Sequence, residues 1–450
     1  MNSAVTAPPL SSPNRASQPP EACVNPLGHG CVGKDRLVAT IVQSGVVDGN
    51  LEAALGKMSE KELNLVAQMV SRIKHNEQNG TNLASGMSAA QAKEFLRSLI
   101  TEATKPDEIN QGMHTGCTVV TMMSRLAREN PAEYLRIGVE LASKGTAKLK
   151  NGEDLLINRS AFEASLTDKT GRYSNLTMSE RVMMASLMDF GNGKGATYDF
   201  RTDQSSGFRV GGEEIGLHKG LYQHQYLRVA SALFGDIHHT ESDTAKVRAH
   251  LEGKNAPGTL VDIRWSKTGD HVNHMVEFIG FDKNGDVIIR NPWGTENPPT
   301  ANGPASRRVR PDLGKGYETI SREEFYSRIN SIVVVDNSKP PMTAENDPSV
   351  RGDLGKDMPY AMGVVDPAVW SLTNGTKSAI NQLNVNELSR LLDEHGDSVA
   401  QSIEGEVIRR EKKKAGPQVN AEDEEGLQRL RAKLGALGFP QNLPPNHPTP

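Results

Sequence analysis

Apolar residues recur at helical spacing through the first third of the chain. Three segments, residues 35–47, 59–73 and 88–103, each place their apolar side chains on one face of a helix. The second and third segments begin with Ser and carry Glu62 or Gln91 three residues later, which is the capping-box pattern. These patterns predict three amphipathic helices.

A further helix is expected directly after Cys117, and Asn130-Pro131 is expected to end it. Its apolar face consists of Val119, Met122, Met123 and Leu126. The region around it, residues 105 to about 215, is expected to be mainly helical with polar and glycine-rich loops.

The pattern changes from helical to strand-like after residue 257. Residues 258–265, 274–282 and 286–294 are rich in β-branched and aromatic residues and predict strands, with a turn signal at Asp282–Asp286. Two shorter elements follow, namely a helix at 320–329 and a strand at 331–337. A helical half followed by a strand half predicts an α+β fold.

Composition divides the chain further. The first residues are poor in apolar side chains and rich in proline, which predicts disorder. We expect a disordered tail at 1–35, a helical region at 36–104, a core at 105–337, a linker at 338–375, a helical region at 376–437 and a disordered tail at 438–450. The helical region before the core has the place of a propeptide-like cover, which predicts a gain of activity when it is removed.

The charge balance excludes some classes of partner. The chain has 450 residues and a net charge of −4, so it has no global basic field, and nucleic acid is not expected as its main partner. It has no apolar run of about 18 or more residues, so no membrane span is expected. The first 35 residues lack the apolar region of a Sec signal. We expect a cytoplasmic protein, or one exported by a non-Sec route such as an injected bacterial effector.

Cys117 is the first candidate for chemistry. The chain has three cysteines, too few for a disulfide framework, and Cys117 is the only one after residue 31. It lies at or near the start of the predicted helix, where unpaired N–H groups and the helix dipole favour a thiolate. A free cysteine also packs well in a core. The choice between reaction and packing depends on whether the chain supplies a base.

The strand half contains such a base. His274 begins one predicted strand and Asn291 ends the next, so a hairpin brings both to the same edge of a sheet. In a Cys–His–Asn set the histidine accepts the thiol proton and the asparagine orients the imidazole. Gln111, six residues before Cys117, is a candidate oxyanion donor together with the Cys117 backbone N–H.

These residues form three blocks that resemble a known family. The run from Gln111 to Cys117 is similar to the Gln-Gly-x-x-x-Gly/Ser-Cys block of papain-like cysteine proteases. The strand that begins at His274 has Gly280 at the offset of the family's His block, and Arg290–Gly294 has the Arg-Asn-Pro-Trp-Gly form typical of calpains. The blocks occur in the family's order.

The resemblance covers about residues 105–337 and implies a role for each matching residue. Cys117 would be the nucleophile, His274 the base, Asn291 the orienting residue and Gln111 the oxyanion donor, and Trp293, which we group with the substrate-binding residues, would shield the His–Asn contact from water. His271 is a second candidate base, but no apolar strand follows it directly. The family also binds extended peptides by main-chain hydrogen bonds to a glycine pair. Gly211 and Gly212 match that pair, or form an ordinary loop turn.

Two features depart from the family. Thr118 stands where the family usually has tryptophan, and no EF-hand loop follows residue 338. The resemblance to calpains raises calcium as a ligand, but no motif supports it, and we expect no cofactor and no metal site.

The resemblance implies a papain-like two-lobe fold, with a helical lobe, an antiparallel sheet or barrel lobe, and helical extensions at both ends. It implies a cysteine endopeptidase that hydrolyses a protein or peptide substrate through a thioester acyl-enzyme. Two alternatives stay open. One is another acyl-transfer enzyme on this fold, that is, a deamidase, transglutaminase or acyltransferase. The other is a non-catalytic binding protein with a relic site. The sequence does not indicate an oligomeric state.

Overall fold

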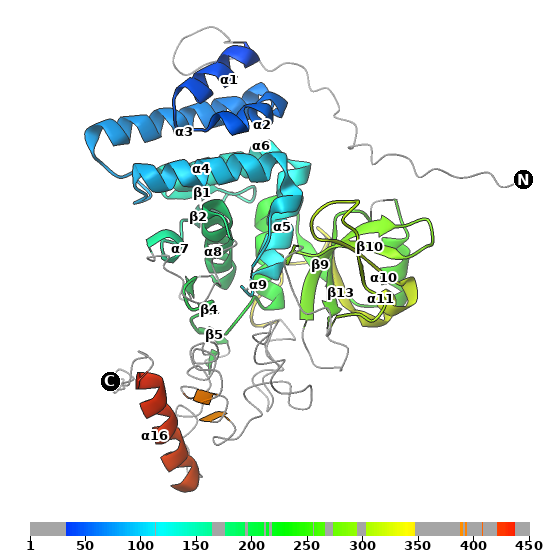
Figure 1. Cartoon of the computed structure of the whole chain (residues 1–450). Coiled ribbons are helices and arrows are strands. Elements are labelled where there is room, and N and C mark those ends of the chain that lie inside the picture. Colours follow the sequence, from blue (N-terminus) through cyan, green and yellow to red (C-terminus); the bar gives the residue numbers. More distant parts are fainter. Residues whose placement is uncertain are drawn as a thin grey trace, which may run out of the picture.

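The chain forms a mixed α+β structure in which a stack of helices packs against one large antiparallel sheet (Figure 1). This structure is a computed structural model. It describes residues 33–112, 114–163, 176–193, 197–210, 213–215, 218–254, 256–265, 273–294, 303–346, 388–389, 392–393, 407 and 421–436. The predicted α+β class is therefore confirmed.

The first helices begin where their capping residues predict. The side chains of Ser59 and Ser88 each accept a hydrogen bond from the backbone N–H three residues later. The side chains of Glu62 and Gln91 accept one from the backbone N–H of Ser59 and Ser88, so both capping boxes are formed. The elements before Cys117 are α1 (Lys34–Gln43), a 3-10 turn η1 (Gly49–Leu51), α2 (Glu52–Lys57), α3 (Glu60–Asn79), α4 (Ala89–Thr104) and a second 3-10 turn η2 (Pro106–Glu108).

The helix predicted after Cys117 is also present. It ends at Glu129, and Asn130 then caps the next helix, whose first residue is Pro131. The helices between Cys117 and the large sheet are α5 (Cys117–Glu129), α6 (Pro131–Lys144), α7 (Ser160–Glu163), α8 (Met178–Asn192) and α9 (Gln223–Phe234).

Three small hairpins interrupt this helical half. Strands of two or three residues are too short to show an alternating pattern, so the sequence indicated only loops there. The hairpins pair β1 (Thr146–Lys148) with β2 (Asp154–Leu156), β3 (Tyr198–Asp199) with β4 (Gln204–Ser205), and β5 (Phe208–Val210) with β6 (Glu213–Ile215).

The predicted strands join a seven-stranded sheet in the order β11-β12-β10-β9-β8-β13-β7, with antiparallel neighbours throughout. Its strands are β7 (His238–Glu241), β8 (Thr259–Arg264), β9 (Asn273–Phe281), β10 (Val287–Arg290), β11 (Arg308–Val309), β12 (Tyr317–Ile320) and β13 (Ile329–Val335). The helices within this half are α10 (Thr244–Leu251) and α11 (Arg322–Arg328).

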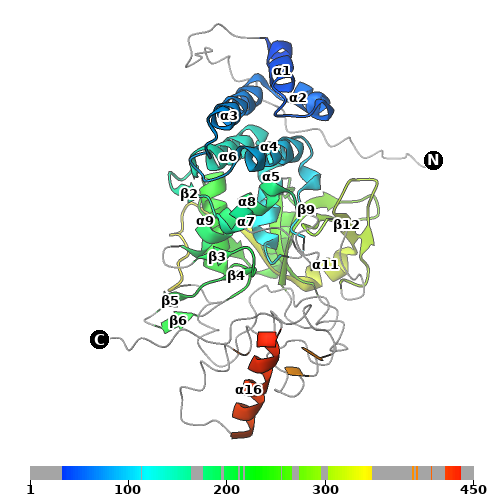
Figure 2. The same ribbon diagram turned by 60° about the vertical axis from the view of Figure 1, so that its left-hand side comes forward.

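Side-chain alternation along β8 and β9 gives the sheet two buried faces. Leu260 and Met275 join the core of the helical stack, whereas Val261 and Val276 join a second core with Phe325 of α11. Helices α5 and α9 therefore lie on one side of the sheet, and α10 and α11 lie on the other (Figures 1 and 2). This arrangement sets the start of α5 against β9.

The helices before Cys117 are built into the core. Val38, Ile41, Phe95 and Leu99 belong to the same buried cluster as Cys117. Removing residues 36–104 would expose much of that cluster to water. A truncated chain is therefore expected to lose stability, which argues against the idea of a detachable cover.

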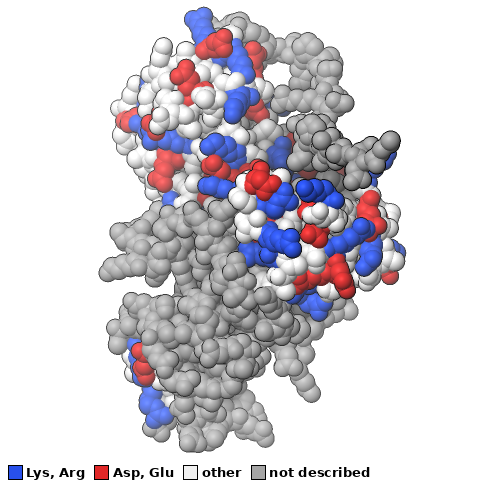
Figure 3. Space-filling model, turned by 45° about the vertical axis from the view of Figure 1, so that its right-hand side comes forward, with Lys and Arg blue, Asp and Glu red and all other residues white. Residues whose placement is uncertain are grey.

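Lys and Arg are interspersed with Asp and Glu over the described part of the face in Figure 3. None of the described helices is long and apolar enough to cross a bilayer. Helix α16 (Ala421–Ala436) agrees with the helix predicted near residues 420–437. Most of the predicted linker and tails lies outside the described residues.

Candidate active site

Cys117 is the first residue of α5 and is 2% exposed. No side chain caps this helix at Gly116, so the first N–H groups of α5 have no side-chain partner. The backbone N–H of Met275 donates to the Cys117 Sγ. Thr121, one turn further along α5, donates its hydroxyl to the Met275 carbonyl at 3.4 Å. The thiol thus lies against the strand residue that follows His274.

The structure brings His274 and Asn291 together. The His274 Nε2–H donates to Asn291 Oδ1 at 2.9 Å, and both side chains are fully buried. Asn291 Oδ1 also accepts from the Trp293 backbone N–H at 3.1 Å, which fixes this oxygen as the acceptor. The imidazole is therefore held with its proton on Nε2. The other ring nitrogen, Nδ1, is buried and has no hydrogen-bond partner among the described residues.

Two tryptophans enclose the imidazole. Trp293 stacks on His274 with ring centroids 3.8 Å apart and planes 12° apart. Trp265, at the end of β8, meets the same ring edge-on at a centroid distance of 5.0 Å. These apolar rings exclude water from the His–Asn hydrogen bond. Trp293 belongs to the Arg-Asn-Pro-Trp-Gly block, whereas no motif marks Trp265.

A buried ion pair orients Asn291. Its Nδ2 donates to Glu318 Oε1 at 3.2 Å, and the Arg307 Nη2 donates to the same oxygen at 2.6 Å. Arg307, Glu318, Asn291 and His274 thus form one chain of hydrogen bonds. Arg307 and Glu318 could not be predicted from the sequence, because no motif marks them and β12 meets β10 only in the folded sheet.

Gln111 lies beside the Asn291 turn. Its backbone N–H donates to the Pro292 carbonyl at 2.8 Å, which ties the segment before Cys117 to the end of β10. Its side-chain Nε2 donates to the His114 carbonyl at 2.6 Å, while Oε1 is buried and has no partner in the described part of the chain. Since an amide nitrogen carries two hydrogens, Nε2 keeps a second donor. Gly112 has φ 55°, a conformation that favours glycine, which explains the Gln-Gly pair.

Asp203 holds the segment between Gln111 and Cys117. Its carboxylate accepts from the Thr115 N–H at 3.1 Å, from the Thr115 hydroxyl at 2.9 Å and from the Tyr198 hydroxyl at 2.8 Å. Burial opposes ionisation of this carboxyl, but the hydrogen bond and charge of His114 hold the Asp203 pKa below its ordinary value. Asp203 is also a non-glycine residue with φ 53°. The sequence carries no signal for it, because it is 88 residues beyond Thr115.

Burial keeps the Cys117 thiol and the His274 imidazole neutral. It raises the pKa of the Cys117 thiol, although the Met275 N–H and the Thr118 hydroxyl favour the thiolate. Burial also lowers the pKa of His274 to about 3, and the positive charge of Arg307 adds to that decrease. The nearest hydrogen-bond partner of the Cys117 Sγ among side chains is Thr118 Oγ1 at 3.8 Å. In this state Cys117 is a neutral thiol and His274 is a neutral imidazole.

The other predicted site residues lie outside the described part of the chain. These are Gly211, Gly212 and His271. Within the described ranges, no group of three His, Cys, Asp or Glu side chains is placed to hold a metal ion.

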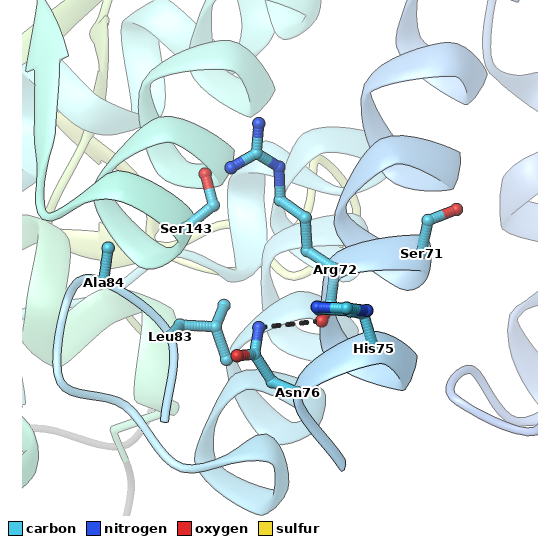
Figure 4. A pocket seen from close by; sticks show the side chains of 7 residues that line it. All are labelled: Ser71, Arg72, His75, Asn76, Leu83, Ala84 and Ser143. Atoms are coloured by element: carbon cyan, nitrogen blue, oxygen red, sulfur yellow. Dashed lines mark hydrogen bonds between the residues drawn. The ribbon is translucent and has the colours of Figure 1, made fainter. Parts of the chain in front are cut away.

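A surface hollow of about 440 Å³ lies elsewhere, between α3, the loop before α4 and the end of α6. It is lined by Ser71, Arg72, His75, Asn76, Leu83, Ala84 and Ser143 (Figure 4). None of these residues belongs to the elements that carry Cys117, His274 or Asn291, so the hollow is separate from the candidate site.

Comparison with models of known protein families gives no match for this chain. A comparison with curated proteins gives none either. The functional interpretation therefore depends on the geometry of the site and on the motif resemblance.

Proposed function

We propose that this protein is a cysteine endopeptidase that hydrolyses a protein or peptide substrate at Cys117. The observation that carries the proposal is the hydrogen bond of 2.9 Å from His274 to Asn291 under the ring of Trp293, next to a cysteine that begins a helix. These are the residues to which the motif resemblance assigns the nucleophile, the base, the orienting residue and the shielding tryptophan. Asn291 holds the imidazole at Nε2, and Nδ1 has no partner among the described residues, so Nδ1 is arranged to exchange a proton.

In the proposed mechanism the Cys117 proton moves to His274 Nδ1, and Sγ forms a bond to the carbonyl carbon of the substrate. The Cys117 N–H and the Gln111 amide donate to the oxyanion. The carbon–nitrogen bond then breaks, and the imidazolium gives its proton to the leaving amine. Water hydrolyses the thioester and restores the thiol. Asn291 keeps the imidazole in the orientation that these transfers need.

The architecture supports a papain-like arrangement within this proposal. The nucleophile comes from a helix of the helical stack, and the base and orienting residue come from neighbouring strands of the sheet. The substrate would lie between these two parts, where the start of α5 meets β9. This assignment of the two parts to papain-like lobes belongs to the proposal.

The experiment compares wild type with Cys117→Ala, Cys117→Ser and His274→Ala in two assays. The first follows covalent labelling by a peptidyl vinyl sulfone by intact mass, and the second follows cleavage of a denatured protein. We expect labelling and cleavage in wild type and neither in Cys117→Ala. Cleavage by Cys117→Ala at the wild-type rate would contradict the proposal.

The same samples separate the alternatives. Release of ammonia or transfer of an acyl group without chain cleavage would indicate another acyl-transfer enzyme on this site. A thiol that labels at the same slow rate in wild type and in His274→Ala would indicate a relic site.

A further inference from the structure

A carboxylate lies beside the thiol and plays no part in the proposed mechanism. Asp262 is directly opposite Met275 in the β8–β9 pair, so their side chains share one face of the sheet. Met275 is the residue whose backbone N–H donates to the Cys117 Sγ. Asp262 therefore lies on the face of the sheet that meets the start of α5, one strand away from the thiol contact.

Asp262 has no cationic partner among the residues that the structure describes. It is 8% exposed, and its one hydrogen bond among the described residues comes from the Asn330 Nδ2 at 3.4 Å. That amide makes a shorter bond, of 2.9 Å, to Asn273. No described Lys or Arg forms an ion pair with Asp262, whereas the buried Glu277 and Glu318 each pair with an arginine. A buried carboxyl without a cation is costly to ionise, and burial raises the pKa of Asp262 to about 7.

From this placement we propose that Asp262 forms a subsite for a cationic substrate side chain, lysine or arginine, next to the bond that Cys117 attacks. This inference rests on the proposed function and specifies its substrate class. An ammonium or guanidinium group would supply the missing partner and form a charge-assisted hydrogen bond with the carboxylate. Asp262 and Met275 lie directly opposite each other and are about 5 Å apart, a span that a side chain of lysine length covers.

The same contact would affect the nucleophile. The negative charge of Asp262 opposes ionisation of the thiol and adds to the raised pKa of Cys117. A bound cation neutralises that charge and so removes this opposition. A cationic side chain is therefore expected to speed the reaction step as well as to tighten binding, which a remote attraction between surface charges would not do.

The test uses a series of acetyl-tripeptide vinyl sulfones with alanine at two positions. The one remaining residue is lysine, norleucine or glutamate, and it is placed at each of the three positions in turn. Norleucine has nearly the shape of lysine without the charge, so their ratio isolates the charge. The assay measures the inactivation constant and the maximal inactivation rate at pH 8, with labelling of Cys117 confirmed by mass.

At one position we expect the lysine probe to inactivate the protein about tenfold or more faster than the norleucine probe, and the glutamate probe to be slowest. The reason is that the buried charge of Asp262 is costly when it is unpaired. Asp262→Asn keeps the shape and the acceptor for Asn330, and should bring lysine and norleucine to equal rates. Glu323→Gln removes the same charge from an exposed position of α11 and should leave the ratio unchanged.

Equal rates for lysine and norleucine at all positions of wild type, with labelling that depends on His274, would overturn this inference and leave the proposed function standing. That comparison needs no variant, so it holds even if Asp262→Asn does not fold. Absence of labelling that depends on His274 with every probe would overturn the proposed function, and this inference with it.

Discussion

Gly116, the residue before Cys117, has no room for a side chain. A Cβ at this position would lie 2.4 Å from the Met184 Sδ and 2.9 Å from its Cγ. The backbone of Gly116, with φ −83° and ψ 20°, is open to any residue, so strain in the main chain is not the reason for glycine here. Gly116→Ala therefore tests packing between the start of α5 and helix α8 in isolation.

The loss of unfolding free energy that we expect for Gly116→Ala depends on how the clash with Met184 is relieved. Met184 is fully buried, but its thioether chain is flexible, so it is expected to move rather than to block folding. Inserting a methyl group into a packed core costs about 1–3 kcal/mol. We expect Gly116→Ala to lower the free energy of unfolding by about 2 kcal/mol, and to slow labelling of Cys117 because the clash displaces the start of α5.

A double-mutant cycle in urea unfolding measures this clash. Met184→Ala alone leaves a cavity and is expected to cost about 2–5 kcal/mol. It also removes both atoms that the new Cβ meets, so Gly116→Ala in that background should cost at least about 1 kcal/mol less than in wild type. Gly56→Ala, within α2 and with no atom within 4 Å of its Cβ position, is the control and is expected to stabilise the chain slightly.

Additive costs in the cycle would refute the packing argument, because they would show that Met184 does not limit the space at Gly116. A neutral Gly116→Ala with unchanged labelling would refute it as well. The result of the cycle does not depend on the proposed function, since unfolding is measured without a substrate.

Three further predictions follow from the site. Asn291→Ala leaves His274 Nε2 buried without its acceptor and is expected to slow His274-dependent labelling about 100-fold, whereas a fall of less than about threefold would exclude an orienting role. Asp203→Ala removes several hydrogen bonds to a buried charge and is expected to lower the free energy of unfolding by about 3 kcal/mol in urea; a loss under about 1 kcal/mol would contradict the geometry. Burial and the charge of Glu102 raise the pKa of Glu180 to about 8. Stability from protonated Glu180 is thus present below pH 4.5 and is lost as pH rises through about 8, so Glu180→Gln should be more stable than wild type at pH 9 and not at pH 4, by urea midpoints at each pH.

Local signals predicted much of the secondary structure. The capping boxes at Ser59 and Ser88, the helix break at Asn130-Pro131 and the turn after β9 each depend on a few adjacent residues, and all are present in the structure. The three small hairpins were not predicted, since short strands leave no alternation to detect. The packing of the first four helices into the main core was also not predicted, because amphipathicity shows that a face is buried but not against what.

In the candidate site, too, residues within short motifs could be predicted and residues outside them could not. Motif spacing identified Gln111, Cys117, His274 and Asn291, whose motifs span a few residues each. The residues that hold them, such as Asp203, are distant in sequence from their partners. Asp203 meets Thr115 through a hairpin connection, and nothing in the local sequence indicates that contact. Supporting residues of this kind become visible only when the chain is folded, because their function is set by position rather than by pattern.

The burial that keeps Cys117 and His274 neutral sets a condition on the proposed reaction. Moving the thiol proton to the imidazole creates two charges at once, and burial disfavours each of them separately. The hydrogen bond to Asn291 stabilises the imidazolium, but the charge of Arg307 opposes it, and the carboxylate of Asp262 opposes the thiolate. Of these contributions, only the charge of Asp262 lies where a substrate side chain is expected to alter it. If the proposed function holds, a cationic substrate therefore does more than fit the site: it removes one of the obstacles to the ion pair that attacks it.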